Sequence, residues 1–321
     1  MKDLMGVFGH RPNALEEALD GIQAAQPGIF ERIPSPYSHT LFKKYPRRNR
    51  VQVVISGGGS HGPLFTGFVG EGLADGACSG DFANAPNAYT LYEVAKRLNQ
   101  GKGILFLTNN FAGDFLNNDM AQELLAGEGI PVRTVYATDD LFSARGEPQE
   151  NRGGLCGIGL LIKLASAAAD TGAELDEVFR IVEKGNHRLR SVSVQINPQE
   201  QAMEFGAGFS GEKAPHSLPY QNADQLTSEL CRWLTNELEA FPGSRYHLAV
   251  NRMQQSTYLE SAILTGLLKT ELEQAGHLVA ACSFGAYFNA FNATGFIVSL
   301  LAADAELDAL LKPAKGYDFT I

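Results

Sequence analysis

Short apolar runs alternate with helical patterns through the first half of the chain. The runs at residues 50–56, 102–108 and 132–138 are rich in β-branched and aromatic residues, as buried strands are. Between them, residues 88–99 and 118–129 place apolar side chains at the spacing of an amphipathic helix. This β-α-β-α order predicts a parallel sheet with helices on its faces.

The flanking segments extend the prediction to the whole chain. Residues 13–26 predict a helix that begins at Asn13, and residues 31–40 are extended and interrupted by proline, so we expect the sheet to start after them. Further elements are expected as helices at 157–173, 174–186, 224–241 and 258–276 and strands at 191–196, 202–211, 247–253, 278–288 and 294–303. The expected fold is two α/β domains, residues 1–186 and 187–321, each with a mostly parallel or mixed sheet covered by helices.

The best candidate for a ligand site is the loop GGGSH at residues 57–61, which follows the first predicted strand. Glycines permit positive φ angles and leave backbone N–H groups open to a ligand oxygen. Residues 109–114 and 139–142 follow the next two strands, at the sheet edge where such folds bind ligands. The alternative is a tight strand-to-helix turn that binds nothing.

Two side chains in these segments have acid–base chemistry. Asp114 follows a strand and a glycine, and the pattern fits a general base and a helix N-cap equally well. His61 could exchange a proton with a ligand hydroxyl near neutral pH, although a single loop histidine is more often structural or solvated.

Composition narrows the function classes. A formal net charge of −10 on 321 residues disfavours broad nucleic-acid binding, which needs clustered Lys and Arg. The one basic cluster, residues 43–50, fits a solvated linker better than an anion site. The chain shows no CxxC pair, no secretory leader and no apolar run of membrane length, which favours a cytoplasmic protein without a metal site or disulfide framework.

Nucleotide-binding motifs are not visible. No Lys followed by Ser or Thr stands at Walker spacing after the glycine loop. The glycines of residues 154–162 have the wrong spacing for a dinucleotide fingerprint and follow no clear strand, so they fit helix packing better.

Four motifs together resemble the substrate-binding subunit of dihydroxyacetone kinases, along nearly the whole chain. GGGSHGP followed by GFVGEG is similar to the family's GGGSGHEP and GY[VI]GxG, and NNFAGD is similar to KNYTGD. MEFGAGFSGE is similar to MEFGxGIHGE, and GAYFNAFNATGFIVSLL is similar to the closing GAYxTSLDMTGFSITLL.

This resemblance implies a two-domain α/β fold, usually a homodimer, that binds a short ketose such as dihydroxyacetone. It also implies a separate helical partner that carries the nucleotide and Mg²⁺, so that no cofactor is expected in this chain. The substrate-binding positions that it implies are Gly58, Gly59, Ser60, His61, Asn109, Asp114 and Ser210, with Asp114 and His61 as the catalytic pair.

The departures from the family pattern bear on mechanism. The family's covalent histidine falls on Ser210 and its lysine on Asn109, and the first loop is one glycine shorter, with Gly62 in place of Glu. A serine hydroxyl cannot form the hemiaminal, so we expect non-covalent ketose binding. His216 is a weak alternative, because residues 214–220 have the pattern of an extended surface turn.

Three functions stay open at this point. The first is a divergent kinase subunit that works with a nucleotide-bearing partner. The second is a paralogue without kinase activity that senses the ligand and regulates another protein, which the loss of the histidine and lysine favours. The third is a different reaction on a small sugar with Asp114 as base.

Overall fold

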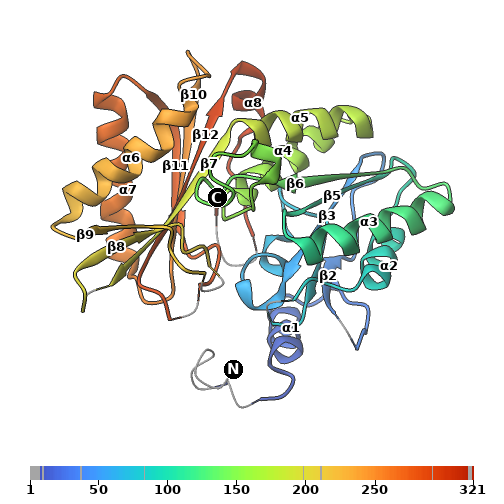
Figure 1. Ribbon diagram of the computed structural model, residues 1–321. Coiled ribbons are helices and arrows are strands. Elements are labelled where there is room, and N and C mark those ends of the chain that lie inside the picture. The colour runs from blue at the N-terminus through green and yellow to red at the C-terminus, as the bar shows by residue number, and fades with distance from the viewer. Residues whose placement is uncertain are drawn as a thin grey trace.

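The computed structural model of this chain describes residue 8 and residues 11–36, 38–82, 84–197, 199–209, 212–290, 292–316 and 320–321. It contains two six-stranded sheets that lie beside each other, with helices on their outer faces and between them (Figure 1). The expected two-part α/β architecture with mixed sheets is therefore confirmed.

The first sheet has the strand order β1-β2-β4-β3-β5-β6. The three predicted strands run parallel to one another: β3 pairs with β5, and β5 pairs with β6, which is an edge strand. The strand bounds are Phe30–Glu31 (β1), His39–Lys43 (β2), Gln52–Gly58 (β3), Gly76–Gly80 (β4), Ile104–Asn109 (β5) and Val132–Ala137 (β6).

The expectation that the sheet starts after residue 40 was wrong. β1 and β2, which precede β3 in the chain, belong to the sheet, and so does β4, which follows it. β1 pairs with β2, β2 pairs antiparallel with β4, and β4 lies parallel to β3. The sequence of β4, GACSG, has no β-branched or aromatic residue, although all of its residues are buried. Small residues are needed there, because a Cβ on Gly76 would lie 2.6 Å from Leu98.

Helices cover both faces of this sheet. Successive side chains of a strand point to opposite faces, so β3 and β5 bury side chains on both sides. Val54 and Phe106 pack against the helices of one face, whereas Val53 and Ile55 pack against the buried helix α4 (Ile158–Asp170) on the other. The helix bounds are Ala14–Ala25 (α1), Ala88–Leu98 (α2), Ala112–Gly127 (α3), Ile158–Asp170 (α4) and Leu175–His187 (α5). Short 3₁₀ turns at Gly59–His61 and Thr66–Phe68 follow β3.

The second sheet has the order β11-β10-β12-β7-β8-β9, in which only β10 and β11 are parallel neighbours. The strand expected at 202–211 ends at Phe205, and the predicted surface turn at 214–220 contains strand β9. The bounds are Leu189–Asn197 (β7), Ala202–Phe205 (β8), His216–Pro219 (β9), Ala223–Leu238 (α6), Arg245–Arg252 (β10), Tyr258–Gln274 (α7), Leu278–Gly285 (β11), Gly295–Ala303 (β12) and Ala305–Leu310 (α8).

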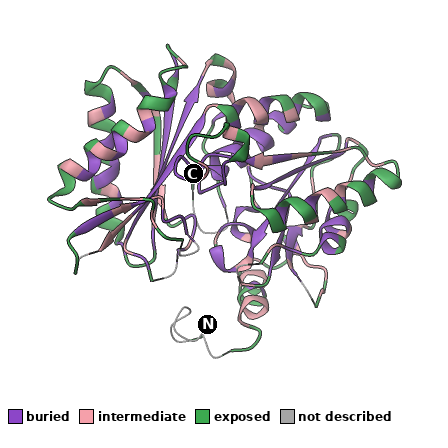
Figure 2. Cartoon of the chain, in the orientation of Figure 1, coloured by how far each residue is buried: buried purple, intermediate pink, exposed green. Residues whose placement is uncertain are grey.

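One apolar core joins the two sheets. Ile55 of β3 and Ile297 and Leu301 of β12 belong to the same cluster, and α4 lies between them. Figure 2 shows the buried strands of both sheets facing this layer. The change of sheet falls between α5 and β7, but the core is not divided there, so two separate domains with a boundary at residue 186 stay a prediction.

The basic cluster at residues 43–50 is not a solvated linker throughout. Arg50 is 4% exposed and lies 2.7 Å from Asp75, and it also forms an ion pair with Asp170. Lys43 lies 2.9 Å from the same Asp75. These pairs tie the start of β3 to the end of α4.

Across the described ranges, no helix has the length and apolar character needed to span a membrane.

Candidate functional site

A cavity of about 320 Å³ lies at the carboxyl ends of β3 and β5, where the first half of the chain meets the second. It brings together four of the predicted site residues, Gly58, His61, Asn109 and Asp114. The other lining residues are Gly57, Phe65, Asn84, Ala85, Phe111, Gly113, Phe209, Glu212 and Phe288.

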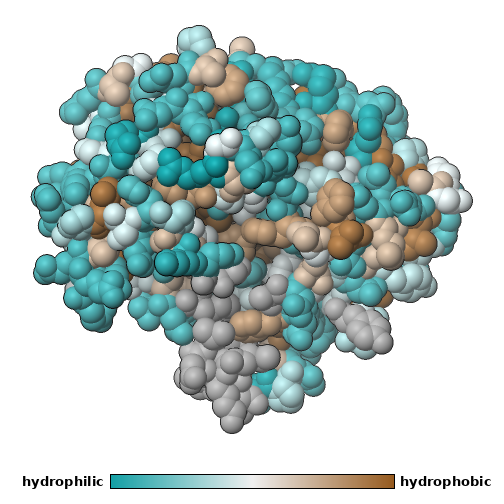
Figure 3. Space-filling model, in the orientation of Figure 1, coloured by the Kyte–Doolittle hydropathy of each residue, from teal (hydrophilic) through white to brown (hydrophobic). Residues whose placement is uncertain are grey.

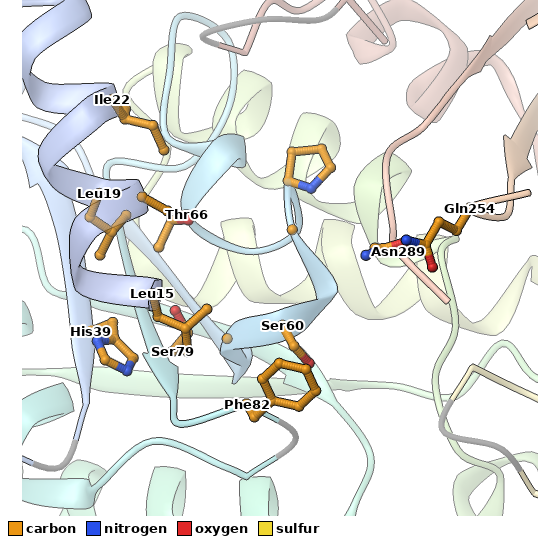
Figure 4. A pocket seen from close by; sticks show the side chains of 14 residues that line it. Leu15, Leu19, Ile22, His39, Ser60, Thr66, Ser79, Phe82, Gln254 and Asn289 are labelled. Carbon is orange, nitrogen blue, oxygen red and sulfur yellow. The ribbon is translucent and has the colours of Figure 1, made fainter. Parts of the chain in front are cut away.

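Gly59 and Ser60 do not line this cavity. They face a second cavity of about 340 Å³ between the glycine loop and α1, where Ser60 lies near Phe82 (Figure 4). Ser210 falls outside the described residues, but Phe209 and Glu212 on either side of it line the first cavity.

The loop requires glycines because neighbouring atoms pack very close to it, and not because its residues have positive φ angles. None of Gly57, Gly58 and Gly59 has a positive φ, which corrects the expected reason for the glycines. A Cβ on Gly57 would lie 1.8 Å from the Phe65 ring, and a Cβ on Gly59 would lie 2.4 Å from a backbone oxygen of Gly80. Glycine therefore lets the Phe65 ring and β4 pack directly against the loop.

His61 is buried and fixed from the second half of the chain. Its Nδ1 lies 3.2 Å from the backbone oxygen of Asn289. The ring stacks on Phe288 at a centroid distance of 4.7 Å and meets the edge of Phe209 at 4.7 Å. Burial lowers the pKa of His61, so the ring is neutral, and because Nδ1 donates to Asn289, Nε2 is a hydrogen-bond acceptor.

Asp114 lies in the first turn of α3, and the N-cap of that helix is Phe111, with no side-chain capping bond. The N-cap interpretation of Asp114 was therefore wrong. Its Oδ1 atom is buried, with no hydrogen-bond partner in the part of the chain that the structure describes. Burial raises the pKa of Asp114 to about 7, because the carboxylate loses its hydration.

Asn109 ends β5 and is 2% exposed. Its Oδ1 is also buried without a hydrogen-bond partner among the described residues. A Cβ on Gly154 would lie 2.4 Å from this oxygen, so the glycine leaves room for the amide. The cavity is thus lined by three residues that carry hydrogen-bond acceptors, Asn109, Asp114 and His61, so a ligand that donates hydrogen bonds matches it.

Two other predicted segments lie elsewhere. Asp139 is fully buried and accepts the backbone N–H groups of Leu155 and Gly157, at 2.9 Å and 3.1 Å, so it supports the start of α4. Asp140 accepts the N–H of Phe142 at 2.9 Å and does not line the cavity. His216 lies outside the cavity lining too, with its ring against Phe142, Phe205 and Trp233.

Sequence reasoning missed Asn84, Glu212 and the aromatic walls of the cavity. Phe209 and Phe288 stand inside motifs quoted for the family resemblance, but their spacing does not show that they meet. In the fold their rings lie 4.2 Å apart between centroids, although 79 positions separate them in sequence. Within the described ranges, no group of three His, Cys, Asp or Glu side chains is placed to hold a metal ion.

Two known proteins are similar in sequence to more than nine-tenths of this chain. The dihydroxyacetone-binding subunit of a PTS-dependent dihydroxyacetone kinase from Listeria innocua is 30% identical over 311 residues, which are 93% of each chain. L-erythrulose kinase from Pectobacterium atrosepticum is 28% identical over 319 residues, and the match spans 54% of that protein.

A solved structure described as a dihydroxyacetone kinase operon co-activator has a TM-score of 0.86 at 23% identity and covers 94% of this chain and 97% of that one, which supports the fold. The family model of the Dak1 domain matches residues 20–316. The chain therefore belongs to the Dak1 domain family.

Proposed function

We propose that this protein is a ketose-binding subunit of the dihydroxyacetone kinase type. It binds a short ketose such as dihydroxyacetone reversibly and presents a hydroxyl group to a phosphoryl donor on a separate partner. The observation that carries the proposal is the pair of buried residues Asn109 and Asp114, which line one cavity and each have a buried side-chain oxygen, Oδ1, without a partner among the described residues. Buried acceptors of this kind need a donor.

A small polyhydroxy ketone supplies such donors. The two hydroxyl groups of dihydroxyacetone can donate to two of the three acceptors on Asn109, Asp114 and His61, and erythrulose has a third hydroxyl group, while the rings of Phe209 and Phe288 exclude water. As the phosphoryl group reaches a ketose hydroxyl, Asp114 accepts the proton of that hydroxyl. With a pKa of about 7, this carboxyl group is suited to a base that works near neutral pH.

Binding is proposed to be non-covalent. The sequence places serine at position 210, and a serine hydroxyl cannot form a hemiaminal with a carbonyl group. The Asn109 amide is neutral where the family pattern has lysine, so it offers hydrogen bonds without a charge.

The phosphoryl donor is proposed to lie on a helical partner that carries the nucleotide and Mg²⁺, because no phosphate-binding Lys follows the glycine loop. The chain is also proposed to form a homodimer. Two exposed apolar surfaces support assembly, since such patches often mark interaction sites. One lies on α3, where Figure 3 shows apolar atoms beside the centre of the molecule; the exposed side chains are Phe115, Leu116, Met120 and Leu124 on α3 and Tyr258, Leu259 and Ile263 on α7.

A second candidate is a ligand-sensing regulator without kinase activity. The serine at position 210 and the neutral Asn109 favour it, because both remove groups that the kinase pattern uses. Both candidates predict ketose binding, and they differ in phosphoryl transfer. Turnover of dihydroxyacetone with a purified ATP-dependent partner supports the kinase subunit. Binding without turnover supports the regulator.

Calorimetric titration with dihydroxyacetone and with erythrulose tests the proposal. We expect saturable binding by the wild type, about 10-fold weaker binding by Asn109→Leu because one buried acceptor is lost, and unchanged binding by Asp119→Asn. Asp119 is the control, since it lies on α3, the helix that carries Asp114, accepts from the Tyr136 hydroxyl at 2.5 Å and does not line the cavity. No binding of either ketose, or equal binding by Asn109→Leu, contradicts the proposal.

A further inference from the structure

Lys163 is a buried cation in α4, between the two sheets (Figure 1). It is 7% exposed, and no hydrogen bond or ion pair joins it to any residue that the structure describes. Buried charges in proteins are normally paired, because the loss of hydration must be compensated. The three buried arginines follow that rule: Arg50 pairs with Asp75, and Arg152 and Arg190 pair with Glu237.

Lys163 lines a cavity of about 480 Å³ that is distinct from the ketose cavity and shares no lining residue with it. Three more cations line the same space, one from the turn after β2 and two from the segment after α8. The charged lining residues are Arg47, Glu71, Lys163, Asp170, Lys312 and Lys315.

The charges of this lining do not balance. Four cations stand against two carboxylates, and one of the carboxylates, Asp170, is already paired with Arg47 at 3.1 Å and with Arg50. The excess of two positive charges is local, since the whole chain carries a formal net charge of −10. It matches the charge of a phosphate monoester, which is close to −2 at neutral pH.

The backbone around the cavity is fixed. Lys315 donates its N–H to the backbone oxygen of Glu71 at 3.2 Å. A Cβ on Gly70 would lie 2.6 Å from the backbone oxygen of Lys315, so the segment after α8 packs directly on the 70–72 turn. Ala314 and Ile321 exchange two backbone hydrogen bonds, at 2.8 Å and 2.9 Å, which hold the segment in place.

We propose that this cavity is a second ligand site, which binds a small molecule through a phosphate group. Lys163 contacts the phosphate from the buried side, and Lys312 and Lys315 contact it from the exposed side. Burial lowers the pKa of Lys163 to about 8, so the amine is still largely protonated at neutral pH, and a bound dianion stabilises that charge. The volume of about 480 Å³ leaves room for an organic group beside the phosphate.

Thermal unfolding of the full chain, titrated with inorganic phosphate at constant ionic strength set by chloride, tests this site. We expect the wild-type melting temperature to rise with phosphate. Lys163→Met keeps an unbranched side chain, one atom shorter, and removes the charge, and its apparent phosphate affinity should fall about 10-fold or more. Lys269→Met, which removes an exposed lysine that pairs with Glu273 at 2.7 Å, should respond like the wild type.

Titration with glycerol 3-phosphate, which has no carbonyl group, shows whether the site recognises the phosphate group alone or an organic phosphate. Tighter binding than inorganic phosphate, unchanged by Asn109→Leu, supports an organic phosphate at this site. Equal binding of the two supports recognition of the phosphate group alone. Stronger binding of succinate than of either contradicts the assignment to phosphate.

Should Lys163→Met fail to fold, the exposed pair Lys312→Gln and Lys315→Gln provides the test, and loss of the phosphate response in that double variant supports the site. The proposal is overturned if phosphate has no effect on the wild type at constant ionic strength. It is also overturned if Lys163→Met, or the double variant, responds as the wild type does.

Discussion

Among single residues, Asp114 has the central chemical role in the proposed function. Its carboxyl group is buried at the cavity that the neutral His61 ring also lines, and desolvation is the cause of its raised pKa. A carboxyl group in this state has two uses. When protonated it can donate to a ligand oxygen, and when ionised it can accept the proton of a ligand hydroxyl.

The raised pKa predicts how stability depends on pH in the ligand-free protein. The folded pKa of Asp114 is about 7, above the value of about 3.9 in an unfolded chain, so the unfolded state loses its proton first as pH rises. Stability from this group is therefore present below about pH 4 and is lost as pH rises through the folded pKa near 7.

Asp114→Asn removes this dependence. We expect the stability of the variant relative to the wild type to be greater at pH 8 than at pH 4.5, by on the order of a few kcal/mol. Urea unfolding at both pH values measures the difference, and the comparison cancels the contribution of Asp140, whose pKa burial also raises to about 7. A stability difference that is the same at both pH values contradicts the assignment.

The sequence could identify Asp114, His61 and Asn109 because they stand in motifs that follow strands. It could not identify Asn84, Glu212 or Phe288, which reach the cavity from loops far apart in the chain. Nor could it separate Gly58 from Gly59, because which side of the loop each residue faces depends on the packing of Phe65 and β4.

At the scale of the element, the glycine loop is shaped by its neighbours. The rings and strands that pack against it leave no space for a side chain at positions 57 and 59. The loop continues directly from the end of β3, and it places both His61 and the Phe65 ring at the cavity.

Gly57→Ala tests this packing. The new Cβ would lie 1.8 Å from the Phe65 ring, so the ring must move, at a cost of about 1–3 kcal/mol in unfolding free energy. Because Phe65 lines the cavity, ketose affinity should fall as well. Gly21→Ala is the control, since no atom lies within 4 Å of its new Cβ in α1, and it should stabilise the protein slightly and bind ketose normally. Unchanged stability and affinity in Gly57→Ala would show that the loop adapts freely.

Apolar periodicity predicted the elements that bury large side chains, such as β3, β5 and α4. It missed β4 and β2, because β4 consists of small residues and β2 becomes a strand by pairing with it. β9 was predicted as a turn, since its short proline-containing sequence forms a strand only through pairing with β8. Local sequence does not show whether a segment will pair with another strand.

At the scale of the whole molecule, the ketose cavity is complete only when both halves are present. Asn109 and Asp114 come from the first half, and Phe209, Glu212 and Phe288 come from the second. The shared core around α4 makes the two halves depend on each other. The sequence predicted two sheet-forming halves, but it could not show that one core joins them.

We therefore expect a single cooperative unfolding transition. The one tryptophan, Trp233, lies on α6 in the second half and reports the packing there, whereas far-UV circular dichroism reports both halves. In urea, the two signals should give the same midpoint, because loss of either half exposes the common core. Midpoints that differ clearly would show that the halves unfold separately.

The central claim is that the cavity at Asp114 and Asn109 holds a short ketose without a covalent bond. The most direct test is the carbon-13 resonance of dihydroxyacetone labelled at its carbonyl carbon, recorded with the wild type and with Asn109→Leu. We predict a bound signal in the ketone range that exchanges with the free ligand and weakens in the variant. A bound signal typical of a saturated carbon joined to a protein nitrogen or oxygen, or no bound signal at all, would contradict the claim.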